Sequence, residues 1–289
     1  MADKLVVIVG ETASGKSALA MEVAERFDGE IIAADSWTVY RGFDIGTAKP
    51  SNTEKQRIPH HLIDIREAAD GFNAAMYKNL AGAAIADVGS RGKLPILVGG
   101  TGLYVDSVLF DYHFLPTVAQ SVRDQRNLKN LDELLAEART KNINLDGIDI
   151  RNKRRIIRAL ETGGQRPKKG QMRPNVLIIG IKSNSNELRQ RITKRVAAMS
   201  ALGLENEVRT LSQKYGWDTE PMKGIGYREW QQYFSGNQTL EETKEKIIGS
   251  SMNLAKRQRT WFKRNKDIQW TTRPSEAIDL VTTFLNTSA

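Results

Sequence analysis

The sequence of 289 residues contains no cysteine. That absence excludes a disulfide framework, a thiolate zinc site, an iron–sulfur cluster and a cysteine nucleophile. Long apolar runs are also missing near the start, where the longest covers residues 5–9. Such a run is too short for the apolar region of a signal peptide or for a transmembrane helix. We therefore expect a soluble, cytoplasmic protein that does not enter a membrane.

Positive charge outweighs negative charge in the second part of the chain. In total, 43 lysines and arginines stand against 34 acidic residues, for a net charge of +9. Residues 1–112 carry a net charge of −4, whereas residues 113–289 carry +13. A basic region of this kind is typical of proteins that bind a polyanion, and nucleic acid is the leading polyanion. An ordinary solvated basic surface is the alternative interpretation, equally open from charge alone.

Short continuous apolar runs recur along the chain, at residues 5–9, 30–34, 94–98 and 176–181. Runs of this kind are typical of strands buried on both faces, as in a parallel sheet. Helical patterns lie between them, so we predict an α/β fold with a P-loop NTPase-like parallel sheet. In such sheets ligands bind at the carboxyl ends of the strands. Gly10, Asp35 and Thr101 all fall just after such ends.

Residues 116–174 contain no convincing strand and consist mainly of charged helical patterns. We interpret them as a helical insertion into a core formed by residues 1–115 and 175–289. Within the insertion, residues 151–173 carry nine basic side chains and one acidic side chain, Glu161. This density of positive charge suits contacts with phosphate groups.

Residues 10–17 read Gly-Glu-Thr-Ala-Ser-Gly-Lys-Ser and match the pattern G-x-x-x-x-G-K-[ST] between a predicted strand and a predicted helix. The glycines let successive N–H groups turn toward a phosphate chain, and the start of the helix adds a favourable field. Lys16 supplies a positive charge, and the Ser17 hydroxyl can ligate Mg²⁺. The predicted diphosphate-binding residues are Gly10, Thr12, Ala13, Ser14, Gly15, Lys16 and Ser17. The motif indicates a diphosphate or triphosphate ligand and does not establish ATP.

Asp35 stands at the end of the second predicted strand. A carboxylate there faces the phosphate loop across the mouth of the sheet. It can hold magnesium through a water molecule or accept a proton from a nucleophile. Taken alone, an aspartate at such a position is more often a helix cap, so the residue by itself leaves its role open.

Five segments that follow one another in order carry a resemblance to a known family: residues 10–17, 35–36, 40–50, 59–64 and 98–104. The sequence resembles the bacterial tRNA dimethylallyltransferases, which form the tRNA isopentenyltransferase family. Later segments agree as well, at residues 155–160, 191–195, 224–228 and 256–262. The resemblance spans nearly the whole chain. Residues 40–50 are far more specific to the family than the phosphate loop, which many unrelated NTPases share.

The resemblance implies a prenyl transfer. Members of the family move a dimethylallyl group from dimethylallyl diphosphate to N6 of adenosine 37, beside the anticodon of tRNA, and release diphosphate. The phosphate loop then holds the prenyl diphosphate with Mg²⁺. By resemblance, Asp35 is the general base, Thr101 is catalytic beside the leaving group or target nucleotide, and Arg195 lies near the diphosphate and target base. The chemistry fits, because an adenine amine needs positioning, proton removal and a stabilised leaving group.

The resemblance also implies which residues contact the anticodon stem-loop of tRNA. They are Asp35, Ser36, Trp37, Thr38, Thr101, Arg123, Arg154, Arg155, Arg158, Tyr227, Arg228, Lys256, Arg257 and Arg259. Residues 256–266 carry six basic side chains and no acidic one. Trp261 and Phe262 lie within that stretch and can stack on bases. Their helical spacing favours a place in the core instead.

Two positions depart from the family pattern. Glu11 stands where the family usually has proline, which adds a negative charge beside a phosphate site. Thr38 stands where many members have glutamine. His60 and His61 are adjacent, and adjacent residues rarely converge on one ion, so we predict no metal site there. Without cysteine, the chain has no zinc finger of the type that eukaryotic members often carry near the carboxyl terminus.

We therefore predict a magnesium-dependent tRNA dimethylallyltransferase, with a monomer as the default expectation. Three alternatives stay open. The first is prenylation of free AMP, ADP or ATP, against which the basic segments argue, because a mononucleotide needs neither of them. The second is a P-loop kinase or NTPase that uses ATP. The third is a nucleic-acid-binding protein with an inactive nucleotide site, against which the intact Lys16, Ser17, Asp35 and Thr101 argue.

Overall fold

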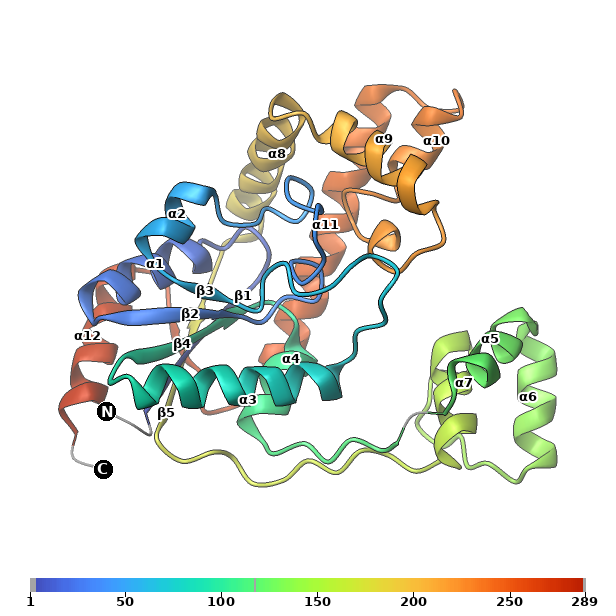
Figure 1. Ribbon diagram of the computed structural model, residues 1–289, viewed down its shortest axis with the longest axis horizontal. Coiled ribbons are helices and arrows are strands. Elements are labelled where there is room, and N and C mark those ends of the chain that lie inside the picture. The colour runs from blue at the N-terminus through green and yellow to red at the C-terminus, as the bar shows by residue number, and fades with distance from the viewer. Residues whose placement is uncertain (1–3, 117, 288–289) are drawn as a thin grey trace. The chain divides into compact units, whose positions relative to one another are not determined.

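The computed structural model describes residues 4–116 and 118–287, and its centre is a sheet of six parallel strands in the order β3-β2-β4-β1-β5-β6 (Figure 1). The strands are β1 (Leu5–Gly10), β2 (Gly29–Ala33), β3 (His60–His61), β4 (Leu94–Gly99), β5 (Val176–Ile181) and β6 (Gln269–Thr271). The predicted α/β fold with a parallel sheet is confirmed. The four longer strands coincide with the four apolar runs, whereas β3 and β6 lie at the two edges and are too short for a sequence pattern to indicate them.

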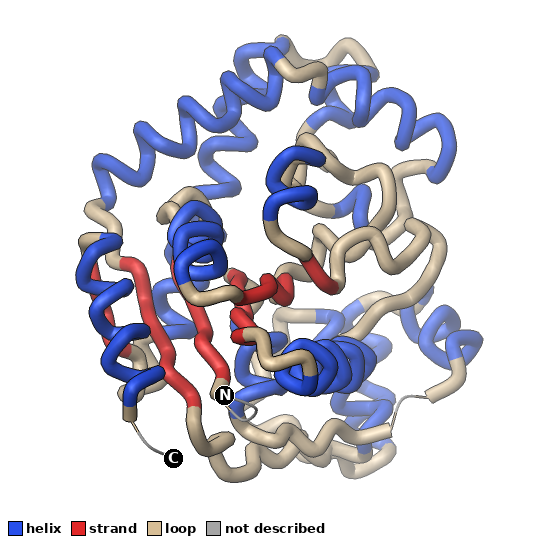
Figure 2. Tube along the Cα trace, turned by 60° about the vertical axis from the view of Figure 1, so that its left-hand side comes forward, coloured by secondary structure: helices blue, strands red, loops and turns tan. Residues whose placement is uncertain are grey.

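Helices pack on the sheet because its central strands are apolar on both faces. On one face, α1 (Lys16–Arg26) and α12 (Pro274–Asn286) share a core with Val6 and Ile8 of β1. Other helices that contact the strands are α3 (Ala74–Ser90), α4 (Gly102–Leu109) and α11 (Leu240–Phe262). Figure 2 shows the red strands running beside one another among the blue helices.

A second core lies among the helices that follow β5. They are α8 (Ser185–Ala201), α9 (Leu204–Tyr215), the 3₁₀ helix η1 (Pro221–Lys223), α10 (Trp230–Phe234) and α11. Tyr40 and Phe43, from the loop between β2 and α2 (Asn52–Arg57), are buried in this core with Tyr227 and Trp230. The core thereby holds the loop over residues 40–50 against helices nearly two hundred residues further along the chain.

Helix α11 spans 23 residues and brings polar side chains to the carboxyl ends of the strands. Thr239 and Glu242 begin it with a reciprocal capping box. Its buried face ends with Gln258 and Phe262. Because buried polar groups are nearly always hydrogen-bonded, Gln258 needs hydrogen-bond partners on this apolar face. Neither α11 nor any other helix in the described ranges is long and apolar enough to cross a membrane.

The chain divides into unit 1, which comprises Met1–Leu109 and Arg173–Ala289, and unit 2, which comprises Phe110–Met172. The helices of unit 2 are α5 (Gln120–Leu128), α6 (Leu131–Thr140) and α7 (Lys153–Thr162), and they share a small apolar core. The sequence predicts the insertion over residues 116–174. Unit 2 begins earlier, because His113 and Lys168 form an antiparallel bridge that joins its two ends.

Candidate active site

The phosphate loop joins β1 to α1 with a backbone that needs small residues. Gly15 precedes α1 in the left-handed conformation, with a φ of 94°, and Ala13 also has a positive φ of 59°. A Cβ on Gly10 would lie 2.7 Å from the Oγ of Ser14, so glycine lets the loop close on itself. The Ser14 hydroxyl is buried and has no hydrogen-bond partner among the described groups. A buried hydroxyl without a partner is costly, and a phosphate oxygen in the loop would supply one.

Lys16 extends from the first turn of α1 and lies beside the loop. Its Nζ donates to the carbonyl oxygen of Glu11 at 3.2 Å, and it forms no ion pair with a carboxylate of the described residues. The pKa of Lys16 falls to about 8, chiefly because burial disfavours its charged form and also because Arg195 lies near. Asp35 and Glu11 oppose this shift. An anionic ligand in the loop would stabilise the charged lysine.

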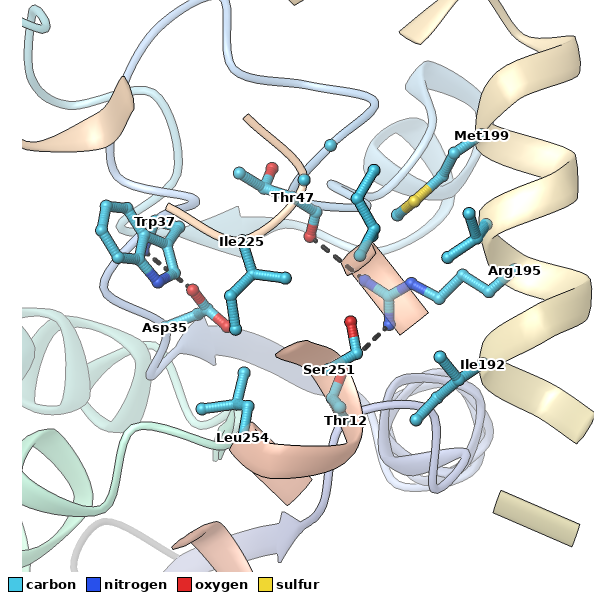
Figure 3. A pocket seen from close by; sticks show the side chains of 14 residues that line it. Thr12, Asp35, Trp37, Thr47, Ile192, Arg195, Met199, Ile225, Ser251 and Leu254 are labelled. Carbon is cyan, nitrogen blue, oxygen red and sulfur yellow. Dashed lines mark hydrogen bonds between the residues drawn. The ribbon is translucent and has the colours of Figure 1, made fainter. Parts of the chain in front are cut away.

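Arg195 projects from α8 into the same region. Its Nη1 donates to the Oγ1 of Thr12 at 3.4 Å, and its Nη2 donates to the carbonyl oxygen of Thr47 at 3.5 Å (Figure 3). Both hydrogen bonds are long, and the guanidinium forms no ion pair within the described chain. Burial lowers the pKa of Arg195, while Asp35 opposes that shift. Lys16 and Arg195 are both half-buried, and two such cations without carboxylate partners indicate an anion site.

Asp35 follows β2 and is held by the start of the next turn. Its Oδ1 accepts the backbone N–H of Trp37 at 2.8 Å, and its other oxygen has no partner among the described groups. This hydrogen bond closes an Asx turn, and because the next helix begins only at Asn52, Asp35 is not a helix cap. Asp35 also interacts electrostatically with Lys16 and Arg195, so its carboxylate can hold the turn and take a chemical role together.

Thr101 follows β4 in a run of glycines, each of which lets a neighbouring part of the chain pack closely against the backbone. A Cβ on Gly99 would lie 2.0 Å from the carbonyl oxygen of Ala34, and one on Gly102 would lie 2.2 Å from the Trp261 ring. The Oγ1 of Thr101 accepts the backbone N–H of Ser36 at 3.1 Å, and its hydroxyl lies 3.4 Å from the Ser36 Oγ. Thr101 is therefore fixed beside the residue that follows Asp35.

Gln258 of α11 links the two loops of the site, a role that the sequence analysis missed. Its Oε1 accepts the backbone N–H of Thr12 at 2.7 Å, and its Nε2 donates to the carbonyl oxygen of Gly100 at 3.0 Å. A Cβ on Gly100 would lie 2.2 Å from that Nε2. The only sequence signal is a polar residue on the apolar face of a long helix, and such a residue identifies no partner by itself.

Two cavities of unit 1, each partly open to solvent, meet at Asp35. One spans about 930 Å³, including solvent at its open mouth, and is lined by Lys16 and Ser17. The other spans about 630 Å³ by the same measure and has a mainly apolar lining of Trp37, Ile192, Val196, Met199, Ile225, Ile247 and Leu254 (Figure 3). Thr12, Asp35 and Arg195 line both cavities. The arrangement can hold an anionic group and an apolar or aromatic group on either side of one carboxylate.

The segment over residues 36–38 lies between these features. Ser36 is bonded to Thr101, Trp37 lines the more apolar cavity, and Thr38 is buried on the wall of the other cavity. The structure therefore brings two of the three predicted base-contacting residues, Trp37 and Thr38, to the cavities that Asp35 joins, whereas Ser36 lines neither cavity and is bonded to Thr101.

Tyr227 is one of the predicted tRNA contacts, but the structure places it in the core, where it is 1% exposed. Its hydroxyl donates to Glu207 at 2.7 Å, and the same carboxylate accepts the backbone N–H groups of Ile45 and Gly46 at 2.8 and 3.0 Å. A Cβ on Gly46 would lie 2.5 Å from the Tyr227 ring. The prediction of direct contact is therefore corrected: Tyr227 supports the loop over residues 40–50.

The predicted basic residues of unit 1 fall into two classes. Lys256 and Arg257 are exposed on α11 and have no side-chain partner in the described part of the chain. Arg259 instead pairs with Glu11 of the phosphate loop, and Arg228 pairs with Glu229 at 3.0 Å. Phe262 is buried, so its expected place in the core is confirmed, whereas Trp261 is half-buried and donates from Nε1 to Asp106.

The predicted basic residues of unit 2 also differ from one another. Arg123 and Arg158 both pair with Glu161, at 2.7 and 3.0 Å, and the Glu161 side chain is 1% exposed. Arg154 and Arg155 are exposed on α7, and the Arg155 side chain has no partner among the described residues. Two of the four arginines therefore serve the fold of unit 2, and Arg155 leaves its charge uncompensated.

The residues at the start of α1 could supply few protein ligands to Mg²⁺. Ser17 is exposed at the start of α1 and lines the larger cavity with Asp35. No group of three or more histidine or acidic residues that could hold a metal ion occurs in the ranges that the structure describes. Magnesium at phosphate sites commonly takes one or two protein ligands, substrate phosphates and water, so a hydroxyl beside a diphosphate site fits it. His60 and His61 bond instead to the Ile58 carbonyl oxygen and to Glu30.

Comparison with known proteins gives matches over nearly the whole chain. A family model described as IPP transferase matches residues 38–265. A tRNA dimethylallyltransferase from Pediococcus pentosaceus is 43% identical over 281 residues, which cover 93% of this chain and 90% of the relative. The structure of a tRNA isopentenylpyrophosphate transferase from Bacillus halodurans is 35% identical, with a TM-score of 0.76 and coverage of 98% and 97% of the two chains.

The structure of a tRNA delta(2)-isopentenylpyrophosphate transferase from Staphylococcus epidermidis is also 35% identical. Its TM-score is 0.72, and the match covers 98% of each chain. The resemblance carried by the ordered sequence segments is confirmed by these matches.

Proposed function

The chain belongs to the IPP transferase family, and on that premise we propose that it transfers a dimethylallyl group from dimethylallyl diphosphate to N6 of adenosine 37 in tRNA. The observation that carries this proposal is the position of Asp35 on the walls of two cavities. One is lined by Thr12, Lys16 and Ser17 of the phosphate loop, and the other is lined by Trp37 and aliphatic side chains. A group transfer between an anionic donor and a base needs such a junction.

In this proposal the phosphate loop binds the diphosphate of the donor. Its backbone N–H groups, Lys16 and Arg195 direct positive charge at the leaving group, where negative charge grows as the bond to carbon breaks. The Ser17 hydroxyl and the diphosphate oxygens are the expected ligands of Mg²⁺, which supplies further positive charge when it is bound. ATP is not required, because the loop recognises phosphates and not a base.

The transfer forms a bond between N6 of adenosine and the first carbon of the dimethylallyl group as the carbon–oxygen bond breaks. The electron pair of that bond leaves with diphosphate, and the N6 proton passes to Asp35. Exocyclic N6 is a poor nucleophile because its lone pair is delocalised into the ring, so proton removal by Asp35 assists the attack. Thr101 lies beside this junction through Ser36 and is proposed to orient the leaving group or the base.

Binding of tRNA requires cations that the fold does not use. Arg155 on α7 and Lys256 and Arg257 on α11 are exposed and unpaired within the described chain, and we assign them to tRNA phosphates together with the exposed Arg154. The anticodon loop is the proposed target, because a base in a single-stranded loop leaves its stack at little cost. A monomer and a cytoplasmic location are parts of the same proposal.

Incubation with labelled dimethylallyl diphosphate tests this function. The acceptors are unmodified tRNA, AMP and ATP, each in a separate reaction. We expect label on tRNA alone. Label on AMP without label on tRNA would contradict the proposal and favour a mononucleotide prenyltransferase. Label on none of the three acceptors, with phosphate released from ATP, would favour an NTPase.

A further inference from the structure

The phosphate loop contains a carboxylate at its second position. Glu11 is 5% exposed, and both of its oxygens are held by Arg259 of α11. Arg259 Nε bonds to one oxygen, and Nη2 donates to the other at 2.9 Å. This two-point geometry is the arrangement in which a guanidinium neutralises a carboxylate best. The Nη1 of Arg259 also reaches the Oγ of Ser185 at 3.4 Å.

The carboxylate lies close to the charge that binds the donor. The backbone carbonyl of Glu11 accepts from Lys16 Nζ, and the Glu11 charge raises the pKa of Lys16 against the effect of burial. Without Arg259, the same negative charge would repel the diphosphate that the loop binds. The loss would also leave a buried carboxylate without its partner.

Adjacent residues of α11 hold adjacent residues of the loop. Gln258 accepts the N–H of Thr12, and Arg259 pairs with Glu11. Helix α11 therefore fixes both the path and the charge of the loop before a donor arrives. The family resemblance implies that Arg259 contacts tRNA, but this side chain already has a buried partner, unlike Lys256 and Arg257 on the same helix.

We propose that Arg259 is a positioning residue for the prenyl donor. Arg259 neutralises Glu11 and thereby sets the affinity of the phosphate loop for a diphosphate. The inference rests on the proposed function only for the identity of the donor. An uncompensated Glu11 would repel any diphosphate in the loop, whatever group the diphosphate carries.

A cycle of variants tests the proposal: Glu11→Gln, Arg259→Gln and the double variant. Arg259→Gln is expected to raise the KM for dimethylallyl diphosphate at least about tenfold, with the KM for tRNA and kcat changed less than about threefold. Glu11→Gln is expected to leave the donor KM equal or lower. The double variant should return it to within about threefold of the original value, because the repelling charge is gone. Added salt should shrink the defect of Arg259→Gln.

Titration with inorganic diphosphate and Mg²⁺ compares the diphosphate affinity of the same variants without any prenyl transfer. The result therefore tests the role of Arg259 even if tRNA is not the acceptor. Arg259→Lys, which keeps the charge, should bind diphosphate better than Arg259→Gln and serves if the latter folds poorly. The matched control is Arg209→Gln, which breaks a pair with Glu205 on α9 away from the site.

A higher KM for tRNA with an unchanged donor KM would overturn the proposal and make Arg259 a tRNA contact. Equal losses for both substrates that follow a lower Tm would reduce the pair to a structural role.

Discussion

Lys16 and Arg195, half-buried on the cavity walls of unit 1, differ from the paired cations of unit 2 and from Lys49, which lines the larger cavity and pairs with Asp44 and Asp64. In unit 2, the Glu161 carboxylate pairs with Arg123 and Arg158, and Glu137 pairs with three further cations. In the cavities of unit 1, Lys16 and Arg195 form no ion pair within the described chain. A cation that is compensated inside its unit stabilises the fold, whereas a half-buried cation without compensation is available for an anionic ligand.

Substitution of Asp35 should have the largest effect, because the two cavities of unit 1 meet at this carboxylate. Asp35→Ala is expected to lower single-turnover transfer about 10²–10⁴-fold, since the N6 proton loses its acceptor. Diphosphate binding should survive, because Lys16 and Arg195 remain. Rapid quenching of the transfer reaction and titration with diphosphate separate the two effects. Asp218→Ala, at an exposed position, is the control. Unchanged transfer would remove Asp35 from the mechanism.

The comparison of cations is tested directly by Arg195→Gln. We expect transfer to fall roughly 10²-fold, because one donor of positive charge to the leaving diphosphate is lost. The melting temperature should stay the same or rise, since no ion pair breaks and a buried charge is removed. Initial rates and thermal unfolding of the same preparation provide both numbers. A lower melting temperature with unchanged transfer would mean that Arg195 serves the fold, as Arg158 does in unit 2.

The lowered pKa of Lys16 predicts a pH dependence of donor binding. Below about pH 8 the free protein already carries the lysine proton, and above it the diphosphate must bind together with a proton. Donor affinity should therefore fall as pH rises through about 8 and approach a tenfold loss per pH unit. Titration with diphosphate across this range measures it, and Lys16→Arg should remove the decline, because arginine stays charged. A flat profile in the original protein would contradict the assignment.

The smallest effect separates two neighbouring arginines of α7. Arg155→Ala should weaken tRNA binding and reduce the salt dependence by a slope of roughly one, because one phosphate contact is lost. Arg158→Ala should instead lower the hydrogen-exchange protection of unit 2, because its guanidinium bonds to Glu161 and to the carbonyl oxygen of Leu115 at 2.9 Å. If Arg155→Ala altered donor affinity alone, unit 2 would not be the surface that holds tRNA.

The sheet and the phosphate loop were predictable because their signals are local. A run of apolar β-branched residues indicates a buried strand, and the glycines around Ser14 indicate a loop that closes on a phosphate. The short strands β3 and β6 carry no comparable pattern, since two or three residues cannot show a period. They exist because longer neighbouring strands offer their edges.

Partners far apart in the chain were not predictable. Glu11 and Arg259 lie near opposite ends of the sequence, and the loop motif alone suggests only that Glu11 places an unfavourable charge beside the phosphate site. Gln258 and Tyr227 were missed or misassigned for the same reason, because their roles depend on which backbone groups the fold brings to them. A basic run in the sequence likewise does not distinguish Arg155 from Arg158, whose roles depend on the distance to Glu161.

The most direct test of prenyl transfer at the junction of the two cavities is a single-turnover reaction analysed by mass spectrometry of the tRNA. Protein loaded with dimethylallyl diphosphate and Mg²⁺ is mixed with unmodified tRNA or with the same tRNA carrying guanosine at position 37. The account predicts one added dimethylallyl group on N6 of adenosine 37, with one diphosphate released, and no product from the guanosine variant. Equal diphosphate release with both tRNAs, or a prenyl group on another nucleotide, would contradict it.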